Sequence, residues 1–495
     1  MSRSYSHYLV AISLLALVAF AVRAASLDTQ SLWRDEVDAL RFATPPWSEM
    51  LSTFTRPGWN GPLYFLLLRG WVTLTGTSEY AMRFFSLAFG VLCVPLTWTL
   101  GCRLFDRSAG LLAALLVAAS PYLTWYGQEV KMYTLVPALA LLAIYGLRRA
   151  VEGQGQTLPL RWWAVQVVAT SLAFYSHILA ALLIPVQVLL YLAWWQRARR
   201  QWVGALVSLA CLTLPYLPLV AWQAPLVLQA RETGFHPYSL GEMAEILLNA
   251  WSLGILNWGW PWGAVLMGAL AVWGLVSLPL PSPPLRGEGV GNRLALVGWL
   301  VTPLLAVWLI SLWQPLFTDR YLIWTASAFY LLVAVGLASF WRFGGRGRCV
   351  AVLLASVILV FNGVNTWRQA TIPIKSDFRA AAAYVAEHRT SGELLIFQIP
   401  YGKYTFDYYF PEEEYPWAEG LYTNHRAPDG SYLMSEQEAA YRMREMTAGY
   451  DAVWLIATET TMWDERRLVQ AWLETNARRV DEAHFTRVDV YRYVK

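Results

Sequence analysis

Long apolar stretches recur along most of the chain and are separated by short polar segments. A helix that crosses a membrane needs ~20 mostly apolar residues, and about eleven stretches approach that length. They are residues 8–25, 80–101, 109–126, 132–147, 162–176, 178–195, 203–222, 254–280, 294–312, 321–341 and 349–366. The pattern predicts an α-helical polytopic membrane protein with about eleven transmembrane helices, in a domain that covers residues 1–370.

Arginine is concentrated in every second segment between these stretches. The arginines concerned are Arg103, Arg107, Arg148, Arg149, Arg161, Arg197, Arg199, Arg200, Arg286, Arg293, Arg342, Arg346 and Arg348. Because cytoplasmic loops are enriched in Lys and Arg, the alternation predicts a multi-pass protein of the cell membrane with a cytoplasmic N-terminus. Asp35, Glu129, His177 and Asp319 then lie on the external face.

The N-terminal region leaves two structural alternatives open. Residues 21–25 resemble the cleavage region of a secretory signal, but the many later apolar stretches favour an uncleaved first helix. The first external loop covers residues 28–79 and contains an apolar segment, 61–76, that is short for a span. We expect this segment to be a helix lying at the membrane interface. A twelfth span is the alternative, and it would break the alternation of arginines.

The hydrophobic pattern changes after about Ile372. Amphipathic stretches there alternate with short apolar runs that are typical of buried strands. The expected helices are 377–388, 436–448 and 464–476, and the expected strands are 393–398, 452–457 and segments within 478–493. Asp377 is placed to cap the first of these helices. The alternation predicts a small α/β domain, residues 371–495, on the external side of the membrane.

The composition narrows the classes of partner. The chain of 495 residues is 57% hydrophobic and carries a net charge of only +4, which indicates membrane lipids around it and no nucleic-acid partner. Its four cysteines lie within or beside apolar stretches without CxxC spacing, so neither a disulfide framework nor a zinc site is predicted.

The most polar stretch near a predicted membrane face is residues 31–38. It places Arg34 and the carboxylates of Asp35, Glu36 and Asp38 within eight residues of a chain that is only 15% charged. Ionisable side chains at a membrane face are expensive to keep there and are typical of functional sites. Three further external clusters are residues 126–133, 175–177 and 319–321, and all can converge on one cavity.

These residue types suit transfer of a group from a lipid-linked phosphate. Asp35 can act as the base that deprotonates an acceptor hydroxyl. Arg320 and Lys131 can bind the departing phosphate. Each also has a purely structural interpretation: Asp35 or Glu36 can cap a helix. Glu129 and Lys131 can form an interfacial ion pair, His177 can be a satisfied interfacial histidine, and Arg320 can extend to lipid headgroups.

The order of several short motifs resembles a known family. The motifs are Trp33-Arg34-Asp35-Glu36, Gly61-Pro62-Leu63-Tyr64, Ser78-Glu79-Tyr80, Ser120-Pro121-Tyr122, Gln128-Glu129-Val130-Lys131-Met132-Tyr133, Tyr175-Ser176-His177 and Asp319-Arg320-Tyr321. Over residues 1–345 this order resembles the protein O-mannosyltransferase-like members of the GT-C glycosyltransferases. That group includes dolichyl-phosphate-mannose protein mannosyltransferases and lipid A aminoarabinose transferases.

The resemblance implies an inverting membrane glycosyltransferase that uses a polyprenyl-phosphate sugar donor. Asp35 and Glu36 take the catalytic positions. The implied substrate-binding residues are Arg34, Tyr64, Glu129, Lys131, Tyr133, His177, Arg320 and Tyr321. The acceptor hydroxyl belongs to a protein, a lipid or a glycan of the cell envelope.

One motif departs from the family, and it bears on metal binding. Asn60-Gly61-Pro62 stands where many relatives have a basic residue followed by two prolines, so no metal site is predicted there. A divalent cation between Asp35 and Glu129 stays open as an alternative.

Two other classes of function compete with a glycosyltransferase. One is a lipid-linked glycan polymerase, ligase or flippase, although a flippase would need charges through the membrane centre. The other is a non-catalytic membrane assembly protein or sensor whose external domain binds a partner.

Overall fold

The computed structural model describes residues 3–56, 61–153, 159–228, 234–256, 261–277 and 288–495. The chain divides into two compact units. The first comprises residues 1–27 and 42–369, and the second comprises residues 28–41 and 370–495. Residues 28–41 therefore group with the C-terminal part of the chain, whereas the sequence pattern predicts that the whole first external loop belongs to the membrane domain. The physical reason is a set of long-range hydrogen bonds that is described below.

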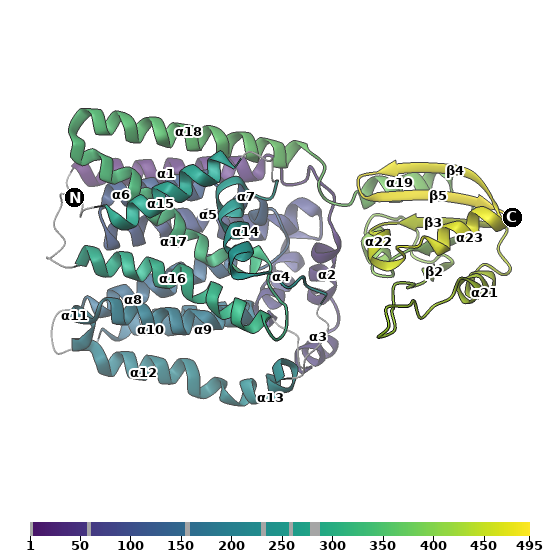
Figure 1. Ribbon diagram of the computed structural model, residues 1–495, viewed down its shortest axis with the longest axis horizontal. Helices are drawn as coiled ribbons and strands as arrows, with labels where there is room; N and C mark the ends of the chain where they lie inside the picture. The colour runs from purple at the N-terminus through teal and green to yellow at the C-terminus, as the bar shows by residue number, and fades with distance from the viewer. Residues whose placement is uncertain (1–2, 57–60, 154–158, 229–233, 257–260, 278–287) are drawn as a thin grey trace. The chain divides into compact units, whose positions relative to one another are not determined.

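The first unit is helical, and its helices run roughly alongside one another (Figure 1). Its elements are α1 (Arg3–Ala24), α3 (Trp47–Phe54), α4 (Pro62–Thr75), α5 (Glu79–Leu104), α6 (Arg107–Ala119), α7 (Pro121–Gly127), α8 (Leu135–Val151), α9 (Leu160–Ser176), η1 (Ile178–Leu182), α10 (Leu183–Ala193), α11 (Trp195–Ala198), η2 (Arg199–Gln201), α12 (Trp202–Thr213), η3 (Leu214–Tyr216), α13 (Leu217–Leu228), α14 (Leu240–Leu253), α15 (Trp262–Val276), α16 (Glu288–Ser311), η4 (Asp319–Thr325), α17 (Ala326–Ser339), η5 (Phe340–Phe343) and α18 (Gly344–Thr371). Each predicted apolar stretch overlaps at least one of these helices, so the helical membrane architecture is confirmed. The segment predicted as an interfacial helix is α4, whose position at a membrane surface stays a prediction.

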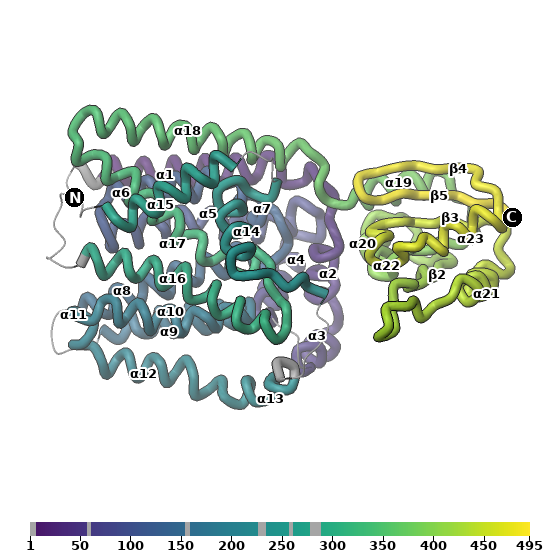
Figure 2. Tube along the Cα trace, in the orientation of Figure 1, coloured from purple at the N-terminus to yellow at the C-terminus, as the bar shows by residue number. Residues whose placement is uncertain are grey.

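Fewer uninterrupted helices than predicted are long enough to span a membrane. By length and composition, five helices among the described residues qualify, or six if the bent pair α6 and α7 is one span. The difference arises because several predicted stretches are short or broken: α8 and α9 have 17 residues each, and residues 178–195 are divided between η1 and α10. In addition, one of the five segments, Asp319–Thr371, reverses direction between α17 and α18 (Figure 2).

Small residues allow the helices of the first unit to pack closely. A Cβ atom added at Gly101 of α5 would lie 2.7 Å from the Cα atom of Gly110 in α6. Only glycine fits at such a crossing, and small residues at helix contacts are typical of membrane bundles.

The arginine-bearing turns meet at one end of the helices. Arg103, in the last turn of α5, pairs with Glu152 at the end of α8 at 2.7 Å. The side chain of Asn292 in α16 donates to the carbonyl of Leu104. Turns predicted to share a membrane face therefore contact one another, while the direction in which the termini face stays a prediction.

The second unit is built on a five-stranded sheet with the strand order β2-β1-β3-β5-β4. Its elements are α2 (Arg34–Ala43, which it shares with the first unit), α19 (Phe378–His388), β1 (Leu394–Phe397), α20 (Gly402–Asp407), β2 (Trp417–Glu419), α21 (Glu436–Met446), β3 (Ala452–Ala457), α22 (Thr460–Trp463), α23 (Leu468–Asn476), β4 (Arg478–Phe485) and β5 (Val488–Val494). The strand β1 runs parallel to β2 and β3, and β5 runs antiparallel to β3 and β4. The expected helices and strands are present, and Asp377 caps α19 through the amide of Ala380. The helix predicted from residue 464 begins at Leu468, because the Asp464 carboxylate accepts the Leu468 and Val469 amides at 3.0 Å each.

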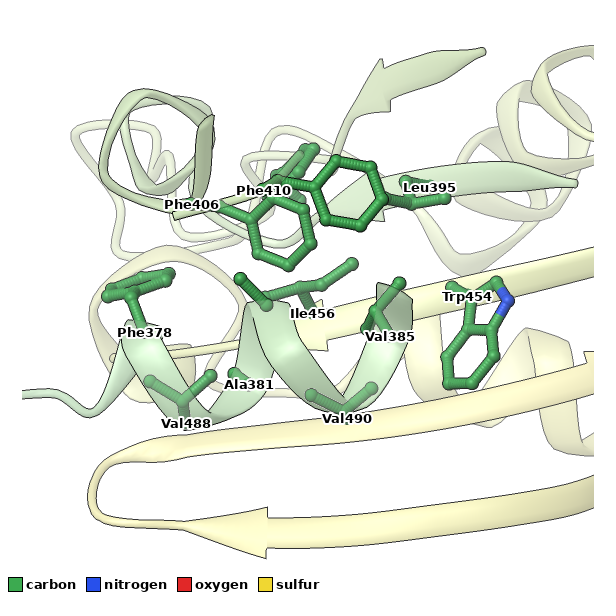
Figure 3. Close-up of a cluster of buried hydrophobic side chains, with 12 residues drawn as sticks. Phe378, Ala381, Val385, Leu395, Phe406, Phe410, Trp454, Ile456, Val488 and Val490 are labelled. Atoms are coloured by element: carbon green, nitrogen blue, oxygen red, sulfur yellow. The ribbon is translucent and has the colours of Figure 1, made fainter. Parts of the chain in front are cut away.

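Both faces of this sheet are covered. Phe378, Ala381 and Val385 of α19 pack against Ile456 of β3 and Val490 of β5 (Figure 3). On the other face, side chains of β1 and β3 pack against those of α21 and α23. Strands that are buried on both faces read as continuous apolar runs, which explains why β1 and β3 were recognisable from the sequence.

Candidate active site

The first unit places one group of candidate residues around the turn between α7 and α8. The chain bends by 56° between α6 and α7, where Ser120 caps α7 by accepting the Leu123 amide. The bend frees carbonyls at the end of α6, and the fully buried Arg23 donates to those of Val117 and Ala118 at 3.2 Å each. In the sequence, Arg23 is recognisable only as part of a signal-like stretch, although an arginine within an apolar run is itself a mark of function or structure.

Two tyrosines of α7 hold the start of η4. The Tyr126 hydroxyl donates to the Asp319 carboxylate at 3.0 Å, and the Tyr122 hydroxyl donates to the Asp319 carbonyl at 3.0 Å. The next residue, Arg320, has its guanidinium carbon 5.8 Å from the ring centroid of Tyr133. The tyrosines therefore fix the backbone from which Arg320 extends, a contact that the sequence pattern does not predict because the two segments are 193 positions apart.

Positive charge converges near His177, which lies between α9 and η1. The ring of His177 is 5.0 Å from that of Tyr321, and its Nδ1 atom accepts the amide of Leu179. Burial, together with the smaller effects of the charges of Arg320 and Lys131, lowers the pKa of His177 to about 4. His177 is consequently neutral near pH 7, and the positive charge of this group comes from Lys131 and Arg320.

Glu129 and Tyr64 are buried parts of the same group. Glu129 is 1% exposed, and its carbonyl accepts the Lys131 amide in a tight turn. The Tyr64 hydroxyl is 3.4 Å from the hydroxyl of Ser86, which donates to the carbonyl of Lys131. Tyr64 is therefore placed behind the turn that carries Lys131.

The second unit carries the other group, Arg34, Asp35 and Glu36, in the first turn of α2. Negative side chains at this position are stabilised by the helix dipole. Asp35 is half-buried and its carboxylate is 3.8 Å from the Nε atom of the exposed Arg34. Glu36 is fully buried and pairs with Lys375 at 2.8 Å. The two adjacent carboxylates thus have different environments.

No group of three or more His, Cys, Asp or Glu side chains is placed to hold a metal ion in the part of the chain that the structure describes. In the motif where relatives carry a basic residue, Asn60 lies outside the described residues. Gly61 has a φ of +79°, and an added Cβ would lie 2.9 Å from the Met132 side chain. Gly61 is therefore required by its backbone conformation and by its contact with the turn before α8.

Comparison with known proteins bears on the same regions. Residues 56–222 match the model of the dolichyl-phosphate-mannose-protein mannosyltransferase family. This segment contains Tyr64, Glu129, Lys131, Tyr133 and His177. It does not include the candidate residues of α2, which are Arg34, Asp35 and Glu36, or those of η4, which are Arg320 and Tyr321. No curated protein matches the chain.

Solved structures match nearly the whole chain. ArnT from Cupriavidus metallidurans bound to undecaprenyl phosphate is 14% identical, with a TM-score of 0.60 and 97% of each chain covered. The oligosaccharyltransferase AglB from Archaeoglobus fulgidus, in complex with an inhibitory peptide and a dolichol-phosphate, is 13% identical, with a TM-score of 0.58; the match covers 99% of this chain and 74% of that one. These matches confirm the predicted resemblance to GT-C membrane glycosyltransferases at the level of the fold.

Proposed function

We propose that this protein is an integral membrane glycosyltransferase. It takes a sugar from a polyprenyl-phosphate donor and transfers it to an acceptor hydroxyl on the external face of the membrane. The observation that carries the proposal is the placing of Arg320 over the Tyr133 ring and next to Tyr321, whose ring is 5.0 Å from that of the buried His177. Lys131 lies two residues before Tyr133, in the turn that precedes α8. The matched ArnT structure is bound to undecaprenyl phosphate and the matched AglB structure to a dolichol-phosphate, which supports the donor class.

Lys131 and Arg320 bind the donor phosphate in this proposal. Arginine offers a planar pair of donors to phosphate oxygens, and lysine contributes a compact point charge. Asp319 and the tyrosines of α7 hold Arg320 at a fixed place on η4. Because His177 is neutral, it offers a hydrogen bond without adding charge.

Asp35 is the base. As the acceptor oxygen attacks the anomeric carbon, its proton passes to the Asp35 carboxylate. The bond between the anomeric carbon and the phosphate oxygen breaks on the opposite face of the sugar, and the electron pair leaves with the polyprenyl phosphate. The anomeric centre is inverted. The leaving phosphate needs no proton, so a second carboxylic acid is unnecessary, in contrast to glycoside hydrolysis.

The proposal is tested with purified protein and a panel of polyprenyl-phosphate sugars that includes mannose and aminoarabinose donors. Asp35→Asn removes the base, and we expect transfer to fall at least roughly 100-fold with donor binding retained. The matched control is Asp38→Asn, since Asp38 lies on the same helix in an exposed ion pair with Arg41. Transfer that survives in Asp35→Asn excludes Asp35 as the base. If the wild type binds none of the lipid-linked sugars in the panel, polyprenyl-phosphate sugars are excluded as the donor class.

A further inference from the structure

We propose that the C-terminal part of the second unit, residues 370–495, positions the catalytic carboxylate of Asp35 through a buried ion pair between Glu36 and Lys375. This inference rests on the proposed function, because it concerns how Asp35 is aimed for the transfer step. It assigns the unit a part in catalysis. It also moves Glu36 from the catalytic pair to a positioning role.

The pair is buried at both ends. The Nζ atom of Lys375 is 2.8 Å from a carboxylate oxygen of Glu36, and the two side chains are 6% and 0% exposed. Removing one member of a buried pair leaves the other charge without its compensating partner, which is strongly unfavourable. The orientation of Glu36 is therefore tightly coupled to the position of Lys375.

Glu36 also fixes the start of α2. The oxygen that contacts Lys375 accepts the backbone amide of Trp33 at 3.4 Å, and the Trp33 carbonyl accepts the Glu36 amide at 3.0 Å. A glutamate in the first turn that reaches back to the residue before the helix is one half of a capping box. A displacement of Glu36 therefore also changes where the helix begins.

The backbone around Lys375 is held in place by hydrogen bonds from residues 30 and 31, in the loop before α2. The Gln30 side chain accepts the amides of Ile374 and Lys375 at 2.9 Å each, and it donates to the carbonyl of Ile372 at 3.3 Å. Ser31 donates to the carbonyl of Ser376 at 2.7 Å. The loop that carries the carboxylates and the segment that carries Lys375 are thus joined by both backbone and side-chain contacts.

The consequence for Asp35 follows from helix geometry. Successive residues of an α-helix are about 100° apart, so burying Glu36 turns Asp35 toward a different, partly open side. Asp35 keeps 19% of its side chain exposed, and the neighbouring Arg34 lies over the Tyr401 ring at 4.8 Å. Glu36 and Lys375 therefore set the rotation of the helix that presents Asp35.

Lysine is rare in this chain, which has only Lys131, Lys375, Lys403 and Lys495. One of the four falls in the proposed phosphate site and another pairs with Glu36. Lys375 gave no recognisable signal beyond this rarity, because it lies in a short connection between a predicted span and a predicted helix.

The first test is the variant Lys375→Met in the purified full-length protein. We expect kcat for transfer to fall roughly 100-fold, the size of effect that a misplacement of about 1 Å produces, with the donor Kd within about threefold of wild type. Lys375→Arg keeps the charge and should retain most of kcat. The control is Arg492→Met, which breaks the ion pair between Arg492 and Glu393 elsewhere in the same unit and should leave kcat of the folded protein unchanged. An unchanged kcat in Lys375→Met, or a fall equal to that of the control, overturns the proposal.

The double variant Glu36→Gln/Lys375→Met provides a second test if the single variant folds poorly. It removes the stranded carboxylate, so folding should recover while kcat stays below wild type. A double variant with wild-type kcat also overturns the proposal.

Hydrogen exchange separates this proposal from the function on which it rests. Amide exchange over residues 30–38 should rise in Lys375→Met but not in Arg492→Met, whether or not any donor is turned over. If exchange rises and the wild type transfers no sugar, the contact is real and the glycosyltransferase proposal fails. If the wild type transfers sugar and exchange in this segment is unchanged, the positioning role fails.

Discussion

The two ends of the helical unit use arginine in different ways. At one end, Arg103 pairs with Glu152 while 37% exposed, and Arg149 lies over the Trp162 ring at 4.6 Å. At the other end, Arg320 follows a residue held by two tyrosine hydroxyls and lies close enough to lower the pKa of a buried histidine. A basic residue at a helix end is therefore weak evidence of chemistry by itself. A cation beside a buried histidine, on a backbone that tyrosine hydroxyls hold in place, is stronger evidence.

The largest difference between the two ends is expected from truncating their arginines. We expect Arg320→Ala to weaken binding of a polyprenyl-phosphate sugar by roughly 100-fold, because hydrogen bonds to a charged phosphate are lost. Binding is measured by titration of the purified protein. The matched control, Arg149→Ala at the opposite end, should change binding by less than about twofold. Equal effects at the two ends would remove the functional distinction between them.

Removing the tyrosine hydrogen bonds to Asp319, the residue before Arg320, should weaken donor binding less than Arg320→Ala does. Tyr126→Phe removes the hydrogen bond to the Asp319 carboxylate, and we expect donor binding to weaken by roughly tenfold. Tyr122→Phe removes a bond to the carbonyl of the same residue and should weaken binding less. The same titration measures both. If Tyr122→Phe had the larger effect, the backbone of η4 rather than the Asp319 carboxylate would control the site.

The smallest effect near neutral pH is expected from His177. Its pKa is lowered from 6.5 to about 4 in the folded protein, so the unfolded chain takes up the proton first as the pH falls. The free energy of unfolding linked to neutral His177 is therefore fully present above about pH 6.5. It falls progressively toward pH 4, by on the order of 2–3 kcal/mol.

Thermal unfolding across this range, compared between wild type and His177→Gln, measures that loss. The variant should show the weaker pH dependence, and donor binding of the wild type should not follow a His177 titration between pH 6.5 and 8. A binding curve with a midpoint near 6.5 that disappears in His177→Gln would show that the histidine is charged in the working site.

The sequence alone determined the long apolar helices and the strands β1 and β3, whereas α14 and β2 lie in segments for which it predicts no element. Apolar runs of membrane-spanning length identify helices because a spanning segment must satisfy its backbone hydrogen bonds internally. Local chemistry also located the start of α19, since Asp377 bonds an amide only three residues away. The same local rules placed β1 and β3 within a residue or two of their observed bounds.

Tertiary structure alone decided which polar residues meet. Glu36 and Lys375 are 339 positions apart, and Tyr126 and Asp319 are 193 apart. Hydrophobic periodicity shows that a face is buried, but the partner of a buried charge depends on how distant segments pack. For that reason the sequence identified Asp35 and Glu36 as an acidic pair, whereas the fold showed that Asp35 is partly exposed and that Glu36 is buried against Lys375.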